Sequence, residues 1–389
     1  MINVIDRNFN YLAVIDDFES LQFTRSWSSI GRFEIHININ KNNTEHLQKE
    51  NIIFIDEQRA GVILYREIDA ETETLIIRGL QLKSYINRYI TIPPDGEAYD
   101  IQNNYSENII KDYVINNLVN PDDAIRKFDN LVVEAKNNRG MQLKYQTRYK
   151  NLAEEIEKIA NVSGLGWDIH LDLENKQFVF KVLQGRNLTG GQTENPQVIF
   201  SIEFDNIANQ KLVENKLNYK GTGIVAGQGE GQNRAVEVIN NDIKGVDRFE
   251  VFIDARDIED DTMLYDRGIT KLEEFKEVLS FDNEILTDTN VKYMVDYDIG
   301  DIITARNDKW GAMLDSQIME ITEVYEEDFK IMATFGNDTP TLIETIKRQL
   351  DNPISEGGGS SGVGNIDGGK ANTEYGGMDA IVGGGVDGS

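Results

Sequence analysis

One stretch of the chain has the spacing of a phosphate-binding loop. Gly221-Thr-Gly-Ile-Val-Ala226 fits G-x-G-x-x-A, the fingerprint with which dinucleotide-binding folds hold a phosphate at a helix N-terminus. That chemistry needs a strand before the glycines and a helix after them. Here residues 227–231 include three glycines, and an alternating strand pattern follows. The stretch therefore predicts no cofactor site, but a tight loop where backbones approach closely.

Neither the histidines nor the aspartates have the spacing of a metal site. His36, His46 and His170 show no zinc-binding pattern, and the chain has no cysteine that could complete one. Residues 254–261 hold four aspartates, but they lack the D-x-D-x-D-G spacing and terminal glutamate of an EF-hand. We expect solvated side chains in both places and no metal site.

No residue can be assigned a catalytic role. A glycosidase or peptidoglycan hydrolase needs two placed carboxyl groups with separated pKa values. Among 67 acidic residues such pairs can be found anywhere, so a pair is not evidence. The sequence also has no Cys–His pair and no P-loop lysine. We therefore predict a protein that is not an enzyme.

The charge balance is strongly acidic. The 67 Asp and Glu residues against 39 Lys and Arg give a net charge of −28 and a pI near 4.5. Proteins that bind nucleic acid backbones gain affinity from Lys and Arg that release counterions. The composition therefore argues against specific nucleic-acid binding, and it favours solubility at high local concentration.

Length and apolar content limit the possible architectures. A chain of 389 residues, 40% of them hydrophobic, should form two or three domains. No apolar run approaches the roughly 20 residues that span a bilayer, and residues 1–7 lack the features of a secretory signal. Without cysteine there is no disulfide, so burial and assembly must stabilise the chain. We expect no membrane span, and assembly in a cytoplasm.

The first ninety residues have the pattern of antiparallel strands. Arg32-Phe-Glu-Ile-His-Ile-Asn-Ile39 alternates strictly, with its apolar side chains on one face. Further short strand patterns, separated by turns, lie at residues 21–27, 52–55, 61–68 and 74–80. Such spacing is typical of a sandwich or barrel. We predict a first β-barrel over residues 1–92.

Residues 93–196 change to a mixed α+β pattern. A helix is expected over Ser106–Val119, with Ser106 as its N-cap, and another over Asn151–Val162, which Gly164 ends; each has an apolar face. A β-hairpin is expected over Trp167–Val182. We predict an inserted α+β module here, and a strand within residues 197–219 that returns to complete the first barrel.

Residues 220–337 show strands, then one helix, then more strands. With the helix over Thr270–Phe281, this order predicts a second small antiparallel barrel with a helical plug. A further helix is expected within residues 338–353, and residues 354–389 are rich in glycine and predict a flexible arm. Leu342, Ile343, Ile346 and Leu350 form an apolar stripe on that helix, for packing against the barrel or for a short coiled coil.

Four motifs in combination resemble the tail hub proteins of phages. They are WSSIGRFEIHI (27–37), VAGQGEGQNR (225–234), DYDIGDIIT (296–304) and QIMEITEVYE (317–326). Together they are similar to the tail-associated structural proteins of long-tailed phages of Gram-positive bacteria. This family is related to the central baseplate hub of contractile tails.

The resemblance implies a fold and an assembly. The fold would be mainly β with an α+β insertion, two small antiparallel barrels of the tail-hub type and a Gly-rich arm. A homotrimer would then form a pseudo-sixfold ring in the virion, at the tip of the tail, and an acidic ring would let DNA pass without binding. The implied partners are the tail tube or distal tail protein, the tape-measure protein, and distal tip or receptor-binding proteins.

The resemblance also places the subunit contacts of the ring. They are expected in the glycine-rich loop, the turn at 298–301 and one loop tryptophan. The candidate residues are Gly227, Gly229, Glu230, Gly231, Arg234, Asp298, Gly300, Asp301 and Trp310. Two other functions stay open: a tail-tip glycan-binding or peptidoglycan-hydrolysing module, and the hub of a contractile phage-like injection particle.

Overall fold

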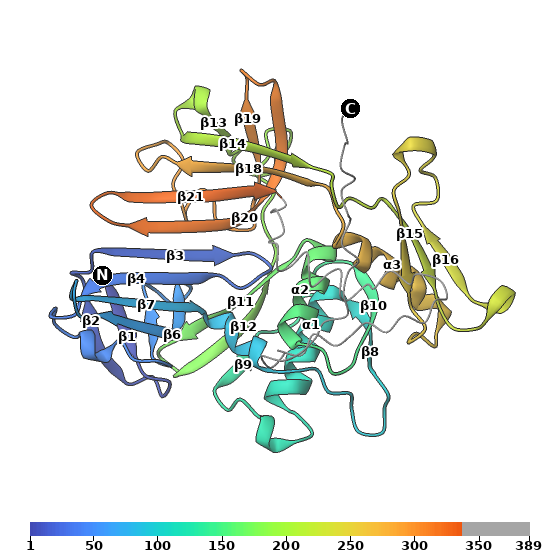
Figure 1. Ribbon diagram of the computed structural model, residues 1–389, viewed down its shortest axis with the longest axis horizontal. Coiled ribbons are helices and arrows are strands. Elements are labelled where there is room, and N and C mark those ends of the chain that lie inside the picture. The colour runs from blue at the N-terminus through green and yellow to red at the C-terminus, as the bar shows by residue number, and fades with distance from the viewer. Residues whose placement is uncertain (337–389) are drawn as a thin grey trace, which may run out of the picture.

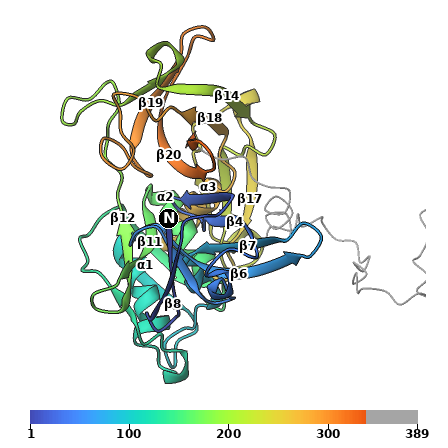
Figure 2. The same cartoon turned by 90° about the vertical axis from the view of Figure 1, so that its left-hand side faces the viewer.

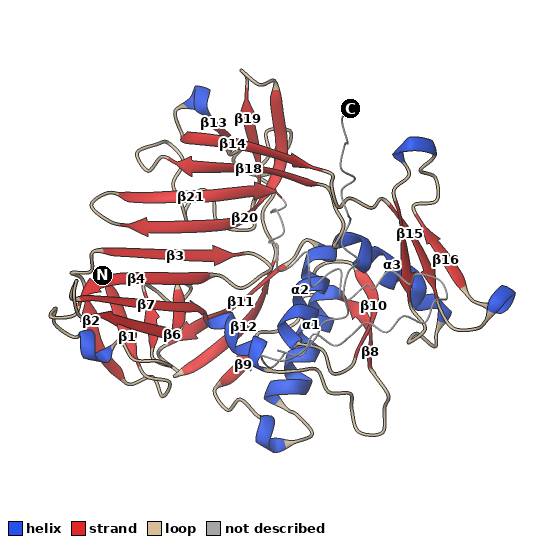
Figure 3. Cartoon of the chain, in the orientation of Figure 1, coloured by secondary structure: helices blue, strands red, loops and turns tan. Residues whose placement is uncertain are grey.

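The computed structural model describes residues 1–336 and is mainly β, as the sequence predicts (Figure 3). One long sheet runs through one side of the molecule, and the α-helices lie beside it together with smaller sheets (Figure 1). The helix predicted within residues 338–353 and the arm at 354–389 lie outside the described residues.

Seven strands form the N-terminal half of the long sheet. They are β1 (Ile2–Ile5), β2 (Tyr11–Ile15), β3 (Ser20–Ser26), β4 (Arg32–Asn38), β5 (Ile52–Phe54), β6 (Ala60–Asp69) and β7 (Thr74–Gln81). Their hydrogen-bonded order is β3-β4-β7-β6-β5-β1-β2. In β4, alternate residues Phe33, Ile35 and Ile37 are buried, so the alternation predicted from the sequence defines the core face.

Six strands form the C-terminal half of the long sheet. They are β13 (Ile199–Ser201), β14 (Ile207–Asn215), β18 (Val278–Ile285), β19 (Ile302–Asn307), β20 (Ala312–Tyr325) and β21 (Phe329–Gly336). Their order is β14-β18-β21-β20, and β19 lies between β20 and β13. The expectation that residues 197–219 return to the first barrel is therefore wrong, because β13 pairs with β19 and β14 with β18.

The two halves join edge to edge through β3 and β20. These strands are antiparallel, from the pair Glu320–Ser26 to the pair Tyr325–Leu21. Seen after a 90° turn, the C-terminal half lies above the N-terminal half and the insertion (Figure 2). The pairs among the described strands give an open order in each half, so two closed barrels stay a prediction.

The insertion between the halves is an α+β module. It contains β8 (Asp100–Tyr105), α1 (Ser106–Val114), β9 (Leu131–Val133), β10 (Gln142–Thr147), α2 (Leu152–Ser163), β11 (Gly166–Asp172) and β12 (Gln177–Leu183). Both predicted helices are present, since α1 continues through a π-helical turn to Val119, and α2 begins after the cap residue Asn151. The predicted hairpin is β11 and β12.

Residues 222–273 form a separate lobe with a small sheet of its own. Its sheet has the order β16-β15-β17, from β15 (Thr222–Ala226), β16 (Val236–Ile239) and β17 (Glu250–Asp254). The helix expected over Thr270–Phe281 is wrong in position, since α3 spans Leu264–Glu273 and β18 begins at Val278. Gly268 lies inside α3, although glycine is unfavourable in the interior of a helix. Packing requires glycine at this position, because a Cβ would come within 2.4 Å of Ile239.

Candidate functional site

Trp27 lies where the two sheet halves and the insertion meet. It directly follows β3, is 3% exposed, and its backbone N–H donates to the Met319 carbonyl in β20 at 2.9 Å. Its ring packs on Gly166 and Gly300, where an added Cβ would lie 2.4 and 2.2 Å from ring atoms. Gly300 also has a φ of +87°, which favours glycine. Both glycines are therefore needed for this three-way contact.

A buried arginine connects the two halves just before Trp27. Arg25, in β3, is 2% exposed, and its guanidinium donates to Asp298 at 2.7 Å and to the Tyr293 hydroxyl at 3.0 Å. Tyr293 in turn donates to the Glu323 carboxylate at 2.9 Å. Burial alone would lower the pKa of Arg25, but Tyr293 and Asp298 outweigh it and raise the pKa. Arg25 therefore stays charged inside the protein.

Glu323 extends this network back to the N-terminal half. Its side chain is fully buried in β20 and accepts a hydrogen bond from Arg59 at 2.9 Å and another from the Tyr325 hydroxyl. Arg59 also pairs with Asp56 at 2.6 Å. We call Arg25, Arg59, Asp298, Tyr293 and Glu323 the seam network. Because its members come from both halves, it fixes how the halves are placed.

A second ion pair ties the end of the insertion to the same turn. Arg186 follows β12, and its guanidinium pairs with Asp301 at 2.6 Å. Asp301 is 4% exposed and also accepts the backbone N–H of Arg186 at 2.8 Å. At Gly185 an added Cβ would lie 1.6 Å from the Gly300 carbonyl oxygen. The chain therefore leaves the insertion in close contact with the C-terminal half.

A buried lysine lies next to the backbone of Trp27. Lys83 is fully buried, and its ammonium donates to the carbonyls of Ser26 at 2.6 Å and Trp167 at 3.2 Å. It also lies 5.0 Å from the centre of the Trp167 ring. Burial lowers the pKa of Lys83 to about 8, against the opposing effect of Asp168 and Glu157.

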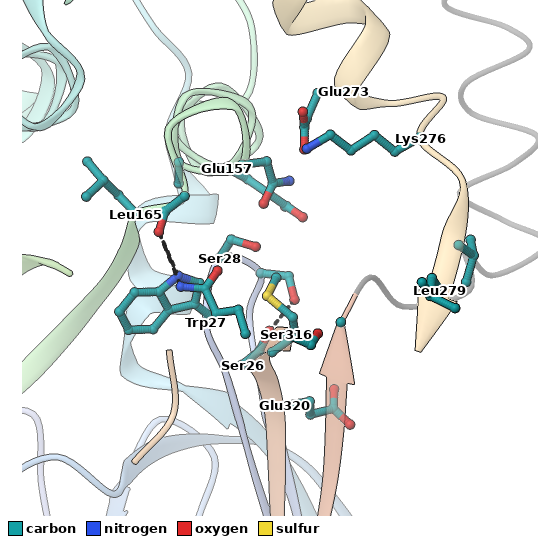
Figure 4. Close-up of a pocket in the computed structure, with 18 of the residues that line it drawn as sticks. Ser26, Trp27, Ser28, Glu157, Leu165, Glu273, Lys276, Leu279, Ser316 and Glu320 are labelled. Atoms are coloured by element: carbon teal, nitrogen blue, oxygen red, sulfur yellow. Dashed lines mark hydrogen bonds and ion pairs between the residues drawn. The ribbon is translucent and has the colours of Figure 1, made fainter. Parts of the chain in front are cut away.

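An open pocket of about 500 Å³ lies beside Trp27, which we call the junction pocket (Figure 4). Acidic side chains from three elements surround it: Glu157 of α2, Glu273 of α3 and Glu320 of β20. Leu279, Leu314 and Met319 contribute apolar surface, and Gly336 also lines it. The pocket thus touches the long sheet, the insertion and the lobe.

The structure does not bring the predicted contact residues together. Gly229, Glu230 and Gly231 are exposed at the tip of the lobe between β15 and β16, where Gly229 and Gly231 have positive φ. Trp310 is 48% exposed in the turn between β19 and β20. The other predicted residues make contacts within the chain. They are Gly227 packed on Leu264, Arg234 paired with Asp254, Asp298 bound to Arg25, Gly300 against Trp27, and Asp301 paired with Arg186.

The sequence contained a signal for the seam network that the motifs did not reveal. Leu21, Phe23, Arg25 and Trp27 share one face of an alternating strand, and all four are buried. Arg25 thus occupies an apolar position in the alternation. Glu323 does the same in β20, two residues after buried Ile321. A charge at such a position indicates a buried ionic partner elsewhere in the chain.

The histidines differ in part from the expectation. His170 was expected in a solvated position, but it is buried in β11, whose two faces are both covered, and burial lowers its pKa. Within residues 1–336, no group of three or more His, Asp or Glu side chains is arranged to hold a metal ion. In the same range, no helix is long and apolar enough to cross a bilayer.

Solved structures define the class of protein to which this fold belongs. Prophage tail protein gp18 from Listeria monocytogenes EGD-e matches with a TM-score of 0.56 and 13% identity, over 90% of this chain and 98% of that one. The 43 kDa tail protein of prophage MuSo2 from Shewanella oneidensis matches with a TM-score of 0.56 and 12% identity, over 86% of this chain and 98% of that one. The tail protein from Neisseria meningitidis MC58 matches with a TM-score of 0.53 and 12% identity, over 87% of this chain and 96% of that one. The chain has the fold of phage tail proteins.

The family follows from the sequence itself. The family of siphovirus ReqiPepy6 Gp37-like proteins matches residues 1–337, and the chain belongs to it. This membership, with the fold, confirms the resemblance to phage tail proteins seen in the four sequence motifs. No curated protein matches the chain in sequence.

Proposed function

We propose that this chain is a structural hub protein of a phage tail tip or baseplate. Three copies would form a pseudo-sixfold ring that closes the end of the tail tube and connects it to distal tip components. The chain would work within the virion by geometry and not as an enzyme. Membership of a siphovirus family and the fold of tail proteins support this role.

One observation carries the proposal: each chain holds two strand-rich halves in a fixed relation. The halves share one sheet through β3 and β20, and the seam network is buried at that junction. A trimer of such chains would place six sheet units around an axis. The seam would supply three of the six junctions, and contacts between subunits would supply the other three.

The contacts between subunits are then expected on surfaces that the chain does not use itself. Among the predicted residues, Gly229, Glu230, Gly231 and Trp310 are exposed. We propose the tip of the lobe and the turn at Trp310 as ring contacts. The tail tube or distal tail protein, the tape-measure protein and receptor-binding proteins would attach to the assembled ring.

Light scattering of the purified chain over a concentration series tests the proposal. A stable species near three times the 44.1 kDa of the chain is the expected result. A mass that stays at 44.1 kDa at every concentration would contradict a free-standing trimer. Binding of such a monomer to purified cell walls would then favour the glycan-binding function instead.

A further inference from the structure

The junction pocket lies directly at the point where the described chain ends. Gly336 closes β21 and lines the pocket, so residues 337–389 continue from its edge. The pocket is formed by β20, α2, α3 and the segment between α3 and β18. Whatever fills it contacts the long sheet, the insertion and the lobe at once.

We propose that residues 338–353 of this same chain occupy the junction pocket. As a helix, the stretch from Thr339 to Asn352 would be about 20 Å long. Only residues 337 and 338 separate this stretch from Gly336, which lines the pocket. The proposal does not depend on the hub function, since it concerns contacts within one chain.

Apolar surface on both sides supports this occupant. The sequence places Leu342, Ile343, Ile346 and Leu350 on one face of the expected helix. In the pocket, Leu279, Leu314 and Met319 are only partly buried by the described residues. An aliphatic stripe of this width would cover them, and the burial of each large aliphatic side chain is favourable.

One cation beside the apolar stripe matches the acidic lining of the pocket. Besides Glu157, Glu273 and Glu320, the pocket is lined by Glu274 and Asp315, and by Lys276. On the expected helix Lys347 lies beside the apolar stripe, whereas Arg348 falls on the opposite face, and the segment also carries Asp338, Glu344 and Asp351. Lys347 would therefore meet opposite charge at the rim of the pocket.

Amide hydrogen exchange on the full-length chain tests the proposal. In the variant L342D/I346D, charges replace two residues of the stripe, so the pocket should lose its cover. We expect exchange at residues 26–29, 160–165 and 314–317 to become at least tenfold faster, about 1.4 kcal/mol of lost protection. The matched control V363D/I366D makes the same chemical change in the Gly-rich arm and should leave these amides unchanged.

Three results would overturn the proposal. One is unchanged protection of the pocket in L342D/I346D. The second is an equal loss of protection in V363D/I366D, which would show a general effect of added charge. The third is protection of the pocket amides that rises with protein concentration and is the same in L342D/I346D as in the natural chain. That result would assign the pocket to a second copy of the chain.

The charge complementarity has its own test. The full-length variant K347E should also speed exchange at the pocket, and by a smaller factor at high salt, because salt screens charges at the rim. R348E, on the opposite face of the expected helix, should not. The control K370E changes a charge in the arm and should have no effect. An effect of R348E or K370E equal to that of K347E would overturn the assignment of Lys347 to the rim.

Discussion

Two buried ionic networks of this chain have similar chemistry, but they join residues at very different separations along the sequence. In the insertion, Lys111 and Glu107 are both fully buried on α1 and pair at 2.6 Å. Arg139 and Glu134 complete that network with distances of 2.9 to 3.1 Å. All its members lie within 33 residues of one another. In the seam network, by contrast, Arg25 and Asp298 are 273 positions apart.

Because the two networks join residues at different separations along the sequence, they stabilise different parts of the fold. The insertion network closes inside one module, so it stabilises that module wherever the module lies. The seam network closes only when the two sheet halves are correctly placed, because neither half holds all its charges. A buried ion pair often adds little net stability, but removal of one partner is costly. The seam network therefore acts mainly on the arrangement of the halves.

The largest effect is expected when the seam network loses its central cation. Arg25→Met leaves Asp298 and Tyr293 without their buried donor, and should lower the free energy of unfolding by about 3–5 kcal/mol. Urea unfolding measures this, with Arg78→Met as control, since Arg78 pairs with Glu34 at an exposed site. Hydrogen exchange should also rise first in β3 and β20. Equal losses in both variants would contradict a special role of the seam.

The insertion network should respond to pH. Burial raises the pKa of Glu107, but Arg139 and Lys111 outweigh it and lower the pKa from 4.5 to about 2. The stabilisation is therefore complete above pH 4.5 and is lost as the pH falls toward 2. Relative to Glu107→Gln, the natural chain should lose roughly 2 kcal/mol over this range, because solvent at Arg139 and Glu134 screens part of the interaction. If the difference in unfolding free energy between the natural chain and Glu107→Gln stayed the same from pH 6 to pH 3, this assignment would be contradicted.

Lys83 is a third buried charge, and it differs from both networks because its ammonium donates to backbone carbonyls and not to a carboxylate. Its pKa of about 8 lies below the usual 10.5, so the unfolded chain binds a proton more tightly. The cost of burying the charge is present below pH 8 and decreases as the pH rises toward 10.5. Relative to Lys83→Met, the natural chain should gain roughly 2 kcal/mol between pH 8 and pH 9.5. Chemical denaturation at these two pH values measures the gain, and parallel pH profiles would argue against it.

The smallest effect on stability is expected outside both networks. Trp310 is 48% exposed, so Trp310→Ala should change the free energy of unfolding by no more than about 0.5 kcal/mol. The same substitution should shift the mass of the assembly toward the monomer in light scattering. An unchanged mass would remove Trp310 from the ring contacts and leave the tip of the lobe as the candidate.

The sequence was sufficient for individual elements but not for their partners. The alternation in β4 and the stop at Gly164 predicted strand and helix positions correctly, because these signals act within a few residues. The predicted cap at Ser106 is wrong, since Ser106 is the first residue of α1 and its hydroxyl donates to the Met141 carbonyl. The partner of β13 could not be predicted, because alternation defines a face of a strand and not its neighbour. The three-way contact at Trp27 was missed for the same reason, since it depends on Gly166 and Gly300.

The most direct test of the hub account is electron microscopy of the purified, full-length assembly in negative stain. If each chain contributes two sheet halves held by the seam network, class averages should show a closed ring with threefold symmetry and six similar densities. The same grid prepared with Arg25→Met should show fewer closed rings. Particles with no ring, or rings of another symmetry, would contradict the proposal that three chains build a pseudo-sixfold hub.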